Sequence, residues 1–149
     1  MELDEELLSL ATAFARENVE YALVGGLAVA VWGAPRATQD IDLLIPPLEL
    51  EKAKRCAREQ GFLLENPPQR FRDGMVLHRS SKVVAEQLLM LDLILVDENT
   101  EAYWQKREKK SVDGRDLWVL SREALIAMKN AAGRPQDQAD VLRLLEMDR

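Results

Sequence analysis

Two aspartates, Asp40 and Asp42, follow a glycine pair, Gly25-Gly26, at a distance that can bring together a magnesium site and a phosphate site. Strand side chains alternate between faces, so Asp40 and Asp42 point to the same face if residues 40–44 form a strand. Two carboxylates on one face repel each other unless a cation lies between them, and hard oxygen ligands suit Mg²⁺. Glycines let the backbone approach a phosphate, and a following helix directs free N–H groups at that anion. These residues predict a magnesium–nucleotide site.

A third acid, Asp92, lies inside an apolar run, residues 88–96, that is typical of a central strand. Burying an isolated carboxylate is costly, so such a residue normally has a cation beside it. We expect Asp92 to join Asp40 and Asp42 around Mg²⁺. A structural ion pair with Arg72 or Lys129 is the alternative.

The rest of the chain predicts an α+β protein that positions these acids. We expect helices at 3–17, 27–32, 48–60, 121–132 and 136–147, with a short helix or turn at 103–106. We expect strands at 21–24, 40–44, 62–64, 75–78 and 88–96, and a hairpin over 111–120 that turns at Asp113-Gly114. We predict a single domain over residues 1–149, with its core at about 1–120 and a C-terminal helical segment at about 121–149.

The motif around the aspartates resembles that of a known superfamily. Its residues are Gly25-Gly26-Leu27-Ala28, Gly33, Arg36, Thr38 and Asp40-Ile41-Asp42. This string resembles the nucleotidyltransferases of the DNA polymerase β type, especially the minimal nucleotidyltransferases and the AbiEii-like proteins of toxin–antitoxin systems. The resemblance is strongest over residues 21–45 and extends loosely to Asp92 and to residues 128–137. It implies the nucleotidyltransferase fold, a mixed β-sheet with helices mainly on one face plus C-terminal helices. It also implies a cognate toxin or antitoxin protein as a partner.

The chemistry expected of such a site is Mg²⁺-dependent transfer of an NMP from a nucleoside triphosphate, with release of pyrophosphate. Asp40 and Asp42 would hold two Mg²⁺ ions, and Asp92 would hold the one that receives the acceptor hydroxyl. Gly25 and Gly26 would donate backbone N–H groups to the β- and γ-phosphates. The acceptor would be a hydroxyl of RNA, protein or a small molecule. The alternative is a catalytically weak binding module of the same fold that neutralises a partner protein.

Further residues have both a binding and a structural interpretation. Arg36 can clamp a phosphate or form a surface ion pair, and Thr38 can bind a phosphate or only shape the strand entry. Lys129 can reach the nucleotide or an active-site carboxylate, as the resemblance implies, or extend along an apolar surface. Asp137 and Asp140 are interpreted as acids in the first turn of a helix. Many relatives have Gly-Ser where this chain has Gly25-Gly26, so a serine contact to the triphosphate is missing.

Composition limits the remaining possibilities. The net charge of −6 argues against tight, unspecific binding of nucleic acid, and two basic groups, residues 106–110 and 70–82, are interpreted as solvated faces. A lone cysteine, Cys56, excludes an intramolecular disulfide and is expected to be buried in a helix. We expect core packing for the three tryptophans, no membrane-spanning segment and a cytoplasmic location.

Overall fold

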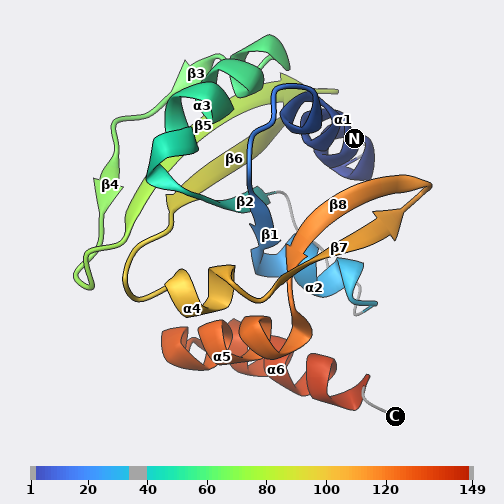
Figure 1. Cartoon of the computed structure of the whole chain (residues 1–149), viewed down its shortest axis with the longest axis vertical. Helices are drawn as coiled ribbons and strands as arrows, with labels where there is room; N and C mark the ends of the chain where they lie inside the picture. The colour runs from blue at the N-terminus through green and yellow to red at the C-terminus, as the bar shows by residue number, and fades with distance from the viewer. Residues whose placement is uncertain (1–2, 34–39, 148–149) are drawn as a thin grey trace.

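The computed structural model describes residues 3–33 and 40–147, which form a mixed sheet with helices on both faces (Figure 1). Arg36 and Thr38 therefore lie outside the described residues. The helices are α1 (Leu3–Arg16), α2 (Gly25–Val31), α3 (Leu50–Glu59), α4 (Glu101–Trp104), α5 (Arg122–Ala132) and α6 (Pro135–Glu146), with a 3-10 turn, η1 (Pro47–Glu49). The strands are β1 (Ala22–Val24), β2 (Asp40–Ile45), β3 (Leu64–Glu65), β4 (Gln69–Arg70), β5 (Val76–Val84), β6 (Gln87–Leu95), β7 (Arg107–Val112) and β8 (Arg115–Leu120). The α+β class is confirmed.

The sheet places the two aspartate-bearing strands next to each other at its centre. The strand order is β3-β5-β6-β2-β1-β8-β7, and β4 pairs with β5. Strand β2 runs parallel to β6 and antiparallel to β1, while β5 and β6 form an antiparallel hairpin. A parallel pair requires a long crossover, and residues 46–86 with α3 and β5 provide it.

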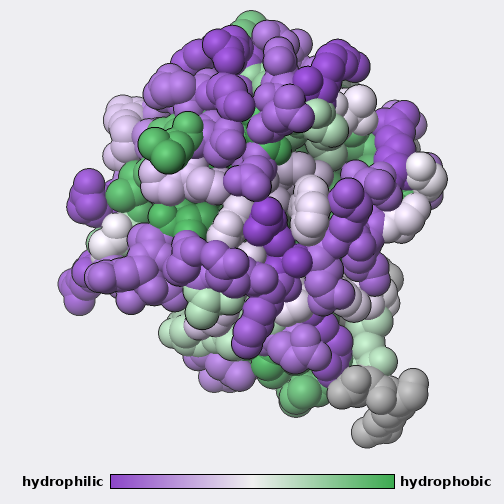
Figure 2. Space-filling model, in the orientation of Figure 1, coloured by the Kyte–Doolittle hydropathy of each residue, from purple (hydrophilic) through white to green (hydrophobic). Residues whose placement is uncertain are grey.

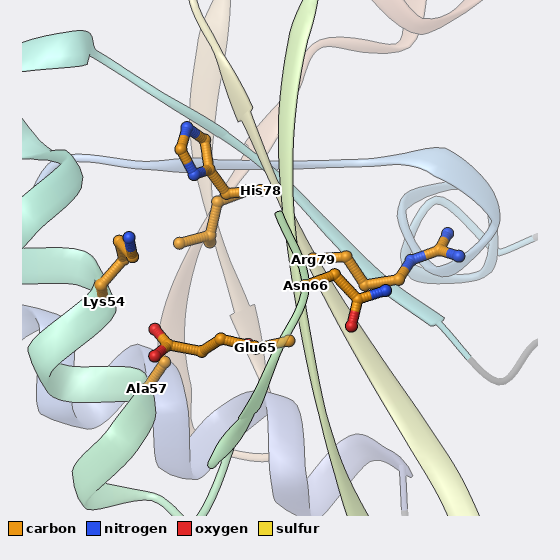
Figure 3. Close-up of a pocket in the computed structure, with 8 residues that line it drawn as sticks. Lys54, Ala57, Glu65, Asn66, His78 and Arg79 are labelled. Atoms are coloured by element: carbon orange, nitrogen blue, oxygen red, sulfur yellow. The ribbon is translucent and has the colours of Figure 1, made fainter. Parts of the chain in front are cut away.

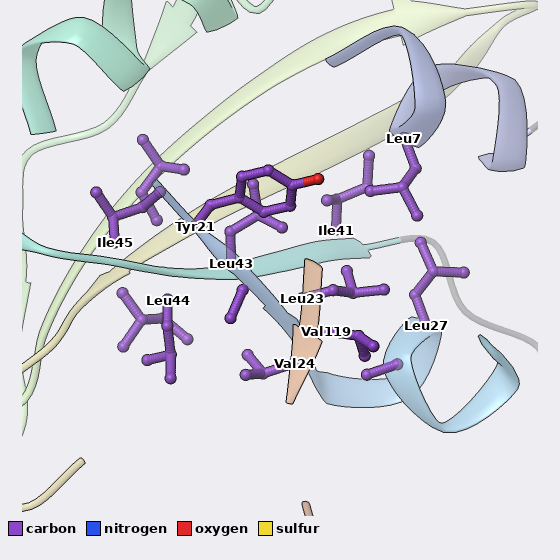
Figure 4. Close-up of a cluster of buried hydrophobic side chains, with 14 of the residues drawn as sticks. Leu7, Tyr21, Leu23, Val24, Leu27, Ile41, Leu43, Leu44, Ile45 and Val119 are labelled. Carbon is purple, nitrogen blue, oxygen red and sulfur yellow. The ribbon is translucent and has the colours of Figure 1, made fainter. Parts of the chain in front are cut away.

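One face of the sheet is closed by α1 and α3, and part of the opposite face by α4, α5 and α6 (Figure 1). The core beneath α1 includes Ile41 and Leu43 of β2, which alternate with the aspartates (Figure 4). Each is at most 1% exposed, and burying such a side chain contributes about 1.5–3 kcal/mol. This apolar alternation fixes the register of β2, because a slip by one residue would bury both aspartates in the core.

Local signals in the sequence explain most element boundaries. The Ser121 hydroxyl accepts a hydrogen bond from the Ala124 N–H at 3.1 Å, which confirms it as the N-cap of α5. Gly133 ends α5 in the left-handed conformation, with φ of 69°. Asp113 and Gly114 both have positive φ, as the expected two-residue hairpin turn requires.

The structure differs from the sequence-based expectations in three places. Helix α2 begins at Gly25, so the glycine pair belongs to the helix rather than to a turn before it. The expected strand at 62–64 is replaced by the two-residue strand Leu64–Glu65, and Phe62 packs into the core before it. Strand β5 continues to Val84, and its hairpin with β6 turns at Ala85 and Glu86. These two residues adopt positive φ without glycine, so the sequence carried no turn signal there.

Among the described residues, no helix has the length and apolar character needed to cross a membrane.

Candidate active site

The structure brings Asp40, Asp42 and Asp92 together on the face of the sheet opposite α1. Asp40 and Asp42 share a face because they are two residues apart on β2. Asp42 lies directly beside Asp92 in the parallel pairing of β2 with β6, while Asp40 lies beside Met90. Asp92 is 3% exposed, and Asp40 and Asp42 are half-buried. We call these residues and Arg79 the carboxylate row.

Arg79 is the member of the row that the sequence-based reasoning missed. It lies opposite Asp92 in the β5–β6 hairpin. Its Nε donates to Asp92 Oδ1 at 2.7 Å and its Nη2 donates to Oδ2 at 2.9 Å. Asp92 thus forms an ion pair, as the alternative interpretation held, but its partner is Arg79 and neither Arg72 nor Lys129. The signal that could have revealed Arg79 is the hairpin register, which depended on the turn at Ala85-Glu86.

The three carboxylates carry more negative charge than Arg79 compensates. Burial, then repulsion by Asp92 and Asp40, raises the pKa of Asp42 to about 7, and a hydrogen bond with Asp92 adds to the shift. Burial and the charge of Asp92 also raise the pKa of Asp40, while Arg79 opposes the shift. The Asp42 carboxyl is therefore partly protonated at neutral pH.

The glycine pair lies against the same carboxylates. Gly25 has φ of 73°, a conformation that L side chains rarely adopt. A Cβ at this position would also overlap the Asp42 carboxylate. Gly26 is buried in the first turn of α2. Any side chain at residue 25 would displace Asp42, so Gly25 is required by the carboxylate row itself.

The donor chemistry of the row fits a hard divalent cation, although the observed arrangement is not a preformed metal cluster. Three neighbouring carboxylates and a raised pKa at Asp42 mark a place where added positive charge is favourable. In the part of the chain that the structure describes, no group of three or more acid, histidine or cysteine side chains is arranged to hold a metal ion. At Asp92, both carboxylate oxygens accept hydrogen bonds from the Arg79 guanidinium. Binding of a metal by all three acids would require Asp92 to share or exchange this contact.

Lys129 belongs to a second group of charges at the C-terminal helices. Its Nζ lies 2.9 Å from Asp140 Oδ2 and 3.5 Å from Asp137 Oδ1. Arg134 donates from Nε to Asp137 Oδ2 at 2.6 Å and from Nη2 to Asp137 Oδ1 at 3.2 Å. We call Lys129, Arg134, Asp137 and Asp140 the C-terminal ion cluster. In the described structure, the carboxylates beside Lys129 are thus those of α6 rather than those of the strands.

Asp137 and Asp140 are buried, which adds to the role of first-turn acids that the sequence predicted for them. Asp137 lies in the first turn of α6 and completes a capping box with Arg134, but it is only 1% exposed, as is Asp140. Burial would raise the pKa of Asp137, yet the hydrogen bond from Arg134 and the charges of Arg134 and Lys129 lower it. Asp137 and Asp140 are thus buried partners of Lys129 as well as acids near a helix N-terminus.

A narrow pocket between α3 and the edge of the sheet is lined by none of the three aspartates (Figure 3). It is lined by Lys54, Ala57, Glu65, Asn66, His78, Arg79, Ser80 and Leu93. The Arg79 side chain extends away from His78 and Lys54, toward the opposite side of the strand (Figure 3). His78 and Arg79 are consecutive in β5, so their side chains point to opposite faces. We therefore assign the chemistry to the carboxylate face and not to this pocket.

The tryptophans and the basic group at 106–110 form part of the packing around β7 and β8. Trp104 is buried, and the Arg107 guanidinium lies 4.0 Å from its ring centre and 4.9 Å from that of Trp118. Lys110 Nζ lies 3.8 Å from the ring centre of Trp32. These cation–π contacts show that Arg107 and Lys110 cover aromatic rings rather than only facing solvent. Cys56 is buried in α3, as expected.

Comparison with known proteins shows the family of the chain. A family profile described as "Uncharacterised nucleotidyltransferase" matches residues 1–130. The chain belongs to this nucleotidyltransferase family. The match spans β1, α2, β2 and β6, the elements that carry Gly25, Gly26 and the three aspartates. No curated protein matches the sequence of this chain.

Solved structures with low sequence identity share the fold. A putative nucleotidyltransferase from Thermotoga maritima is 19% identical, with a TM-score of 0.68 over 99% of this chain and 94% of that chain. The structure of ANT(2'')-Ia in complex with adenylyl-2''-tobramycin is 18% identical, with a TM-score of 0.60 over 91% of this chain and 83% of that chain. JHP933 from Helicobacter pylori is 14% identical, with a TM-score of 0.55 over 93% of this chain and 62% of that chain. These similarities confirm the nucleotidyltransferase fold.

Proposed function

We propose that this nucleotidyltransferase moves an NMP from a nucleoside triphosphate to an acceptor hydroxyl, with Asp40, Asp42 and Asp92 as the catalytic, metal-binding acids. The observation that carries the proposal is the register of β2 and β6, which sets Asp42 beside Asp92 on the face that also carries Asp40. Gly25 abuts the same carboxylates at the start of α2. Acids with the chemistry to bind metal and a backbone that can approach phosphate thus lie at one place.

The residues of the chain would divide the work of holding the reactants. Asp40 and Asp42 would hold two Mg²⁺ ions, and Asp92 would hold one of them. When bound, such ions lower the pKa of the acceptor hydroxyl and neutralise the leaving pyrophosphate. The acceptor oxygen forms a bond to the α-phosphorus while the bond from that phosphorus to the β-phosphate oxygen breaks. Positioning and charge stabilisation then supply most of the rate.

Other chain residues would bind the nucleotide. Gly25 and Gly26 would donate backbone N–H groups to the phosphates, and Arg36, Thr38 and Lys129 remain proposed nucleotide-binding residues. Lys129 would have to act from within its ion pairs with Asp137 and Asp140.

The acceptor would approach across β6 and β5, on the far side of Asp92 from Gly25. There the carboxylate face continues into Val83 and Leu88, a cross-strand pair that is 65% and 48% exposed. Figure 2 shows that hydrophobic patches interrupt an otherwise largely hydrophilic surface on the face that it presents. The fold shared with ANT(2'')-Ia, which was solved with adenylyl-2''-tobramycin, supports testing hydroxylated small molecules beside RNA and protein. A role in a toxin–antitoxin pair would add a cognate protein partner.

One observation favours the alternative, a binding module with weak or lost chemistry. Both oxygens of Asp92 are held by Arg79. In that case the protein would act by binding a partner protein and would transfer no nucleotide.

Incubation with each α-labelled triphosphate, Mg²⁺ and cell extract separates the two functions. We expect label transfer to an acceptor by the wild type and none by Asp42→Asn, which keeps the size of the side chain. Transfer that survives Asp42→Asn would contradict the assignment of the acids. Absence of transfer to RNA, protein and small-molecule fractions, together with stable capture of a protein partner, would support the binding module.

A further inference from the structure

Arg134 differs from the other members of the C-terminal ion cluster in its exposure. Lys129, Asp137 and Asp140 are at most 8% exposed, whereas the Arg134 side chain is 64% exposed. Asp137 accepts from Nε and Nη2 of Arg134 and thereby fixes the plane of its guanidinium. In the described part of the chain, Arg134 Nη1 has no hydrogen-bond partner. The cluster thus holds one exposed cation in a defined orientation.

Arg134 lies near the end of the carboxylate row where the nucleotide would bind. Arg134 is the N-cap of α6, and α6 packs against α2, the helix that starts at Gly25. Gly25 in turn abuts the Asp42 carboxylate. The pKa of Arg134 is raised mainly by its hydrogen bond to Asp137, and the charge of Asp42 also contributes, which places Asp42 within electrostatic range.

We propose that Arg134 binds the triphosphate of the substrate, an inference that rests on the proposed function of the carboxylate row. A guanidinium held on one edge by a carboxylate can present its other edge to phosphate oxygens. The other described cations near the row are less suited to this role. Lys129 is buried against two acids, and Arg79 holds Asp92 on the acceptor side.

For the contact made by Arg134, Lys129 and Asp140 act as positioning residues. Lys129 lies on α5, whereas Asp137 and Asp140 lie on α6, so their ion pairs hold the start of α6 against α5. Asp137 in turn orients the Arg134 guanidinium through the two hydrogen bonds that it accepts from it. The buried part of the cluster therefore determines where the exposed guanidinium points.

Pyrophosphate with Mg²⁺ is the probe that tests this proposal, because it carries the leaving phosphates and no base or acceptor. We would measure its binding by calorimetry, and its inhibition of label transfer, for the wild type and for Arg134→Gln. Arg134→Lys retains a cation that can pair with Asp137. Arg143→Gln is the matched control, since Arg143 is an exposed arginine of the same helix.

We expect Arg134→Gln to weaken pyrophosphate binding and raise the KM for the triphosphate about tenfold, with the acceptor KM unchanged. Arg134→Lys should recover part of the loss, and Arg143→Gln should behave as the wild type. Wild-type pyrophosphate affinity in Arg134→Gln overturns the proposal, as does an equal loss in Arg143→Gln. A lower melting temperature with unchanged pyrophosphate affinity would show that Arg134 only caps α6, which also overturns it. If the wild type binds neither pyrophosphate nor any triphosphate, the proposed function itself fails.

Discussion

The carboxylate row and the C-terminal ion cluster contain similar groups but balance their charges differently. The cluster sets two buried acids, Asp137 and Asp140, against two cations, Lys129 and Arg134. Among the described residues, the row sets three acids against one arginine, Arg79, which is hydrogen-bonded to Asp92. The pKa of Asp137 is lowered, whereas that of Asp42 is raised to about 7.

This difference separates a structural role from a binding role. Folding alone favours compensated charges, because an unpaired buried charge is costly. The cluster meets this condition and ties α6 to α5. The row violates it at Asp42, and such a violation is expected where a ligand supplies the missing charge. The comparison therefore assigns positive ligands to the row and stability to the buried part of the cluster, Lys129, Asp137 and Asp140.

The largest expected effect is on catalysis and comes from Asp42→Asn. This variant removes a proposed metal ligand, so we expect label transfer to fall by at least about 100-fold, as when a preorganised charged contact to the transition state is lost. Without Mg²⁺ the same variant should melt at a higher temperature than the wild type at pH 8, because one repelling charge is gone. A variant with lower stability and normal transfer would reverse the roles assigned to the two regions. The measurements are initial rates and thermal melts in EDTA.

In the cluster, Lys129→Met should act on stability. It leaves Asp137 and Asp140 buried with less compensation, and breaking a buried pair costs about 3–5 kcal/mol. Urea denaturation measures the loss, and Lys106→Met, at an exposed position, is the control. If Lys129→Met is as stable as the wild type but binds triphosphate weakly, Lys129 is primarily a nucleotide-binding residue and the cluster is not only structural.

The pH dependence of the free energy of unfolding should reveal the raised pKa of Asp42. The pKa of Asp42 is about 7 in the folded protein against an ordinary value of 3.8, so between these values the folded state binds more protons than the unfolded state. The contribution of Asp42 therefore lowers the free energy of unfolding as pH rises from about 4 to 7, by at most about 1.4 kcal/mol per pH unit. Denaturation in EDTA at several pH values measures it. Asp42→Asn should lack this component, and an identical pH profile in that variant would contradict the assignment.

Arg79→Gln should have the smallest effect. It should show whether Arg79 and a metal ion compete to offset the negative charge of the acids. Loss of two hydrogen bonds to a carboxylate should destabilise the Mg²⁺-free protein by about 1.5–3 kcal/mol. Added Mg²⁺ should then raise the melting temperature of Arg79→Gln more than that of the wild type, because the competing cation is gone. An equal or smaller rise would show that Arg79 does not compete with the metal.

Much of the carboxylate row could be predicted from the sequence, whereas the cluster could not. The alternation of Asp40 and Asp42 with Ile41 and Leu43 predicts their shared face, because period two is a local property. The apolar run around Asp92 predicts a central strand for the same reason. Whether the two strands are neighbours is not local, and that expectation came from the cost of burying Asp92 without a cation and from the resemblance.

The contacts that the sequence did not predict join residues that are far apart in the chain or on different elements. Arg79 meets Asp92 through a hairpin whose turn residues carry no turn signal, so its register was missed. Lys129 meets Asp140 because α5 and α6 pack together, and the helical spacing of the apolar residues does not fix which polar residues enter that interface. The partner of a charge depends on tertiary packing, which the local pattern does not specify.

The most direct test of the central claim is calorimetric titration with Mn²⁺, used as a probe of the Mg²⁺ site, at pH 6.5 in two buffers of different ionisation enthalpy. We predict that the wild type binds Mn²⁺ and releases most of one proton, because the metal displaces the proton that Asp42 holds below its pKa of about 7. Asp42→Asn should show neither the binding nor the proton release. Undiminished Mn²⁺ binding by Asp42→Asn, or wild-type binding without proton release, would contradict the account.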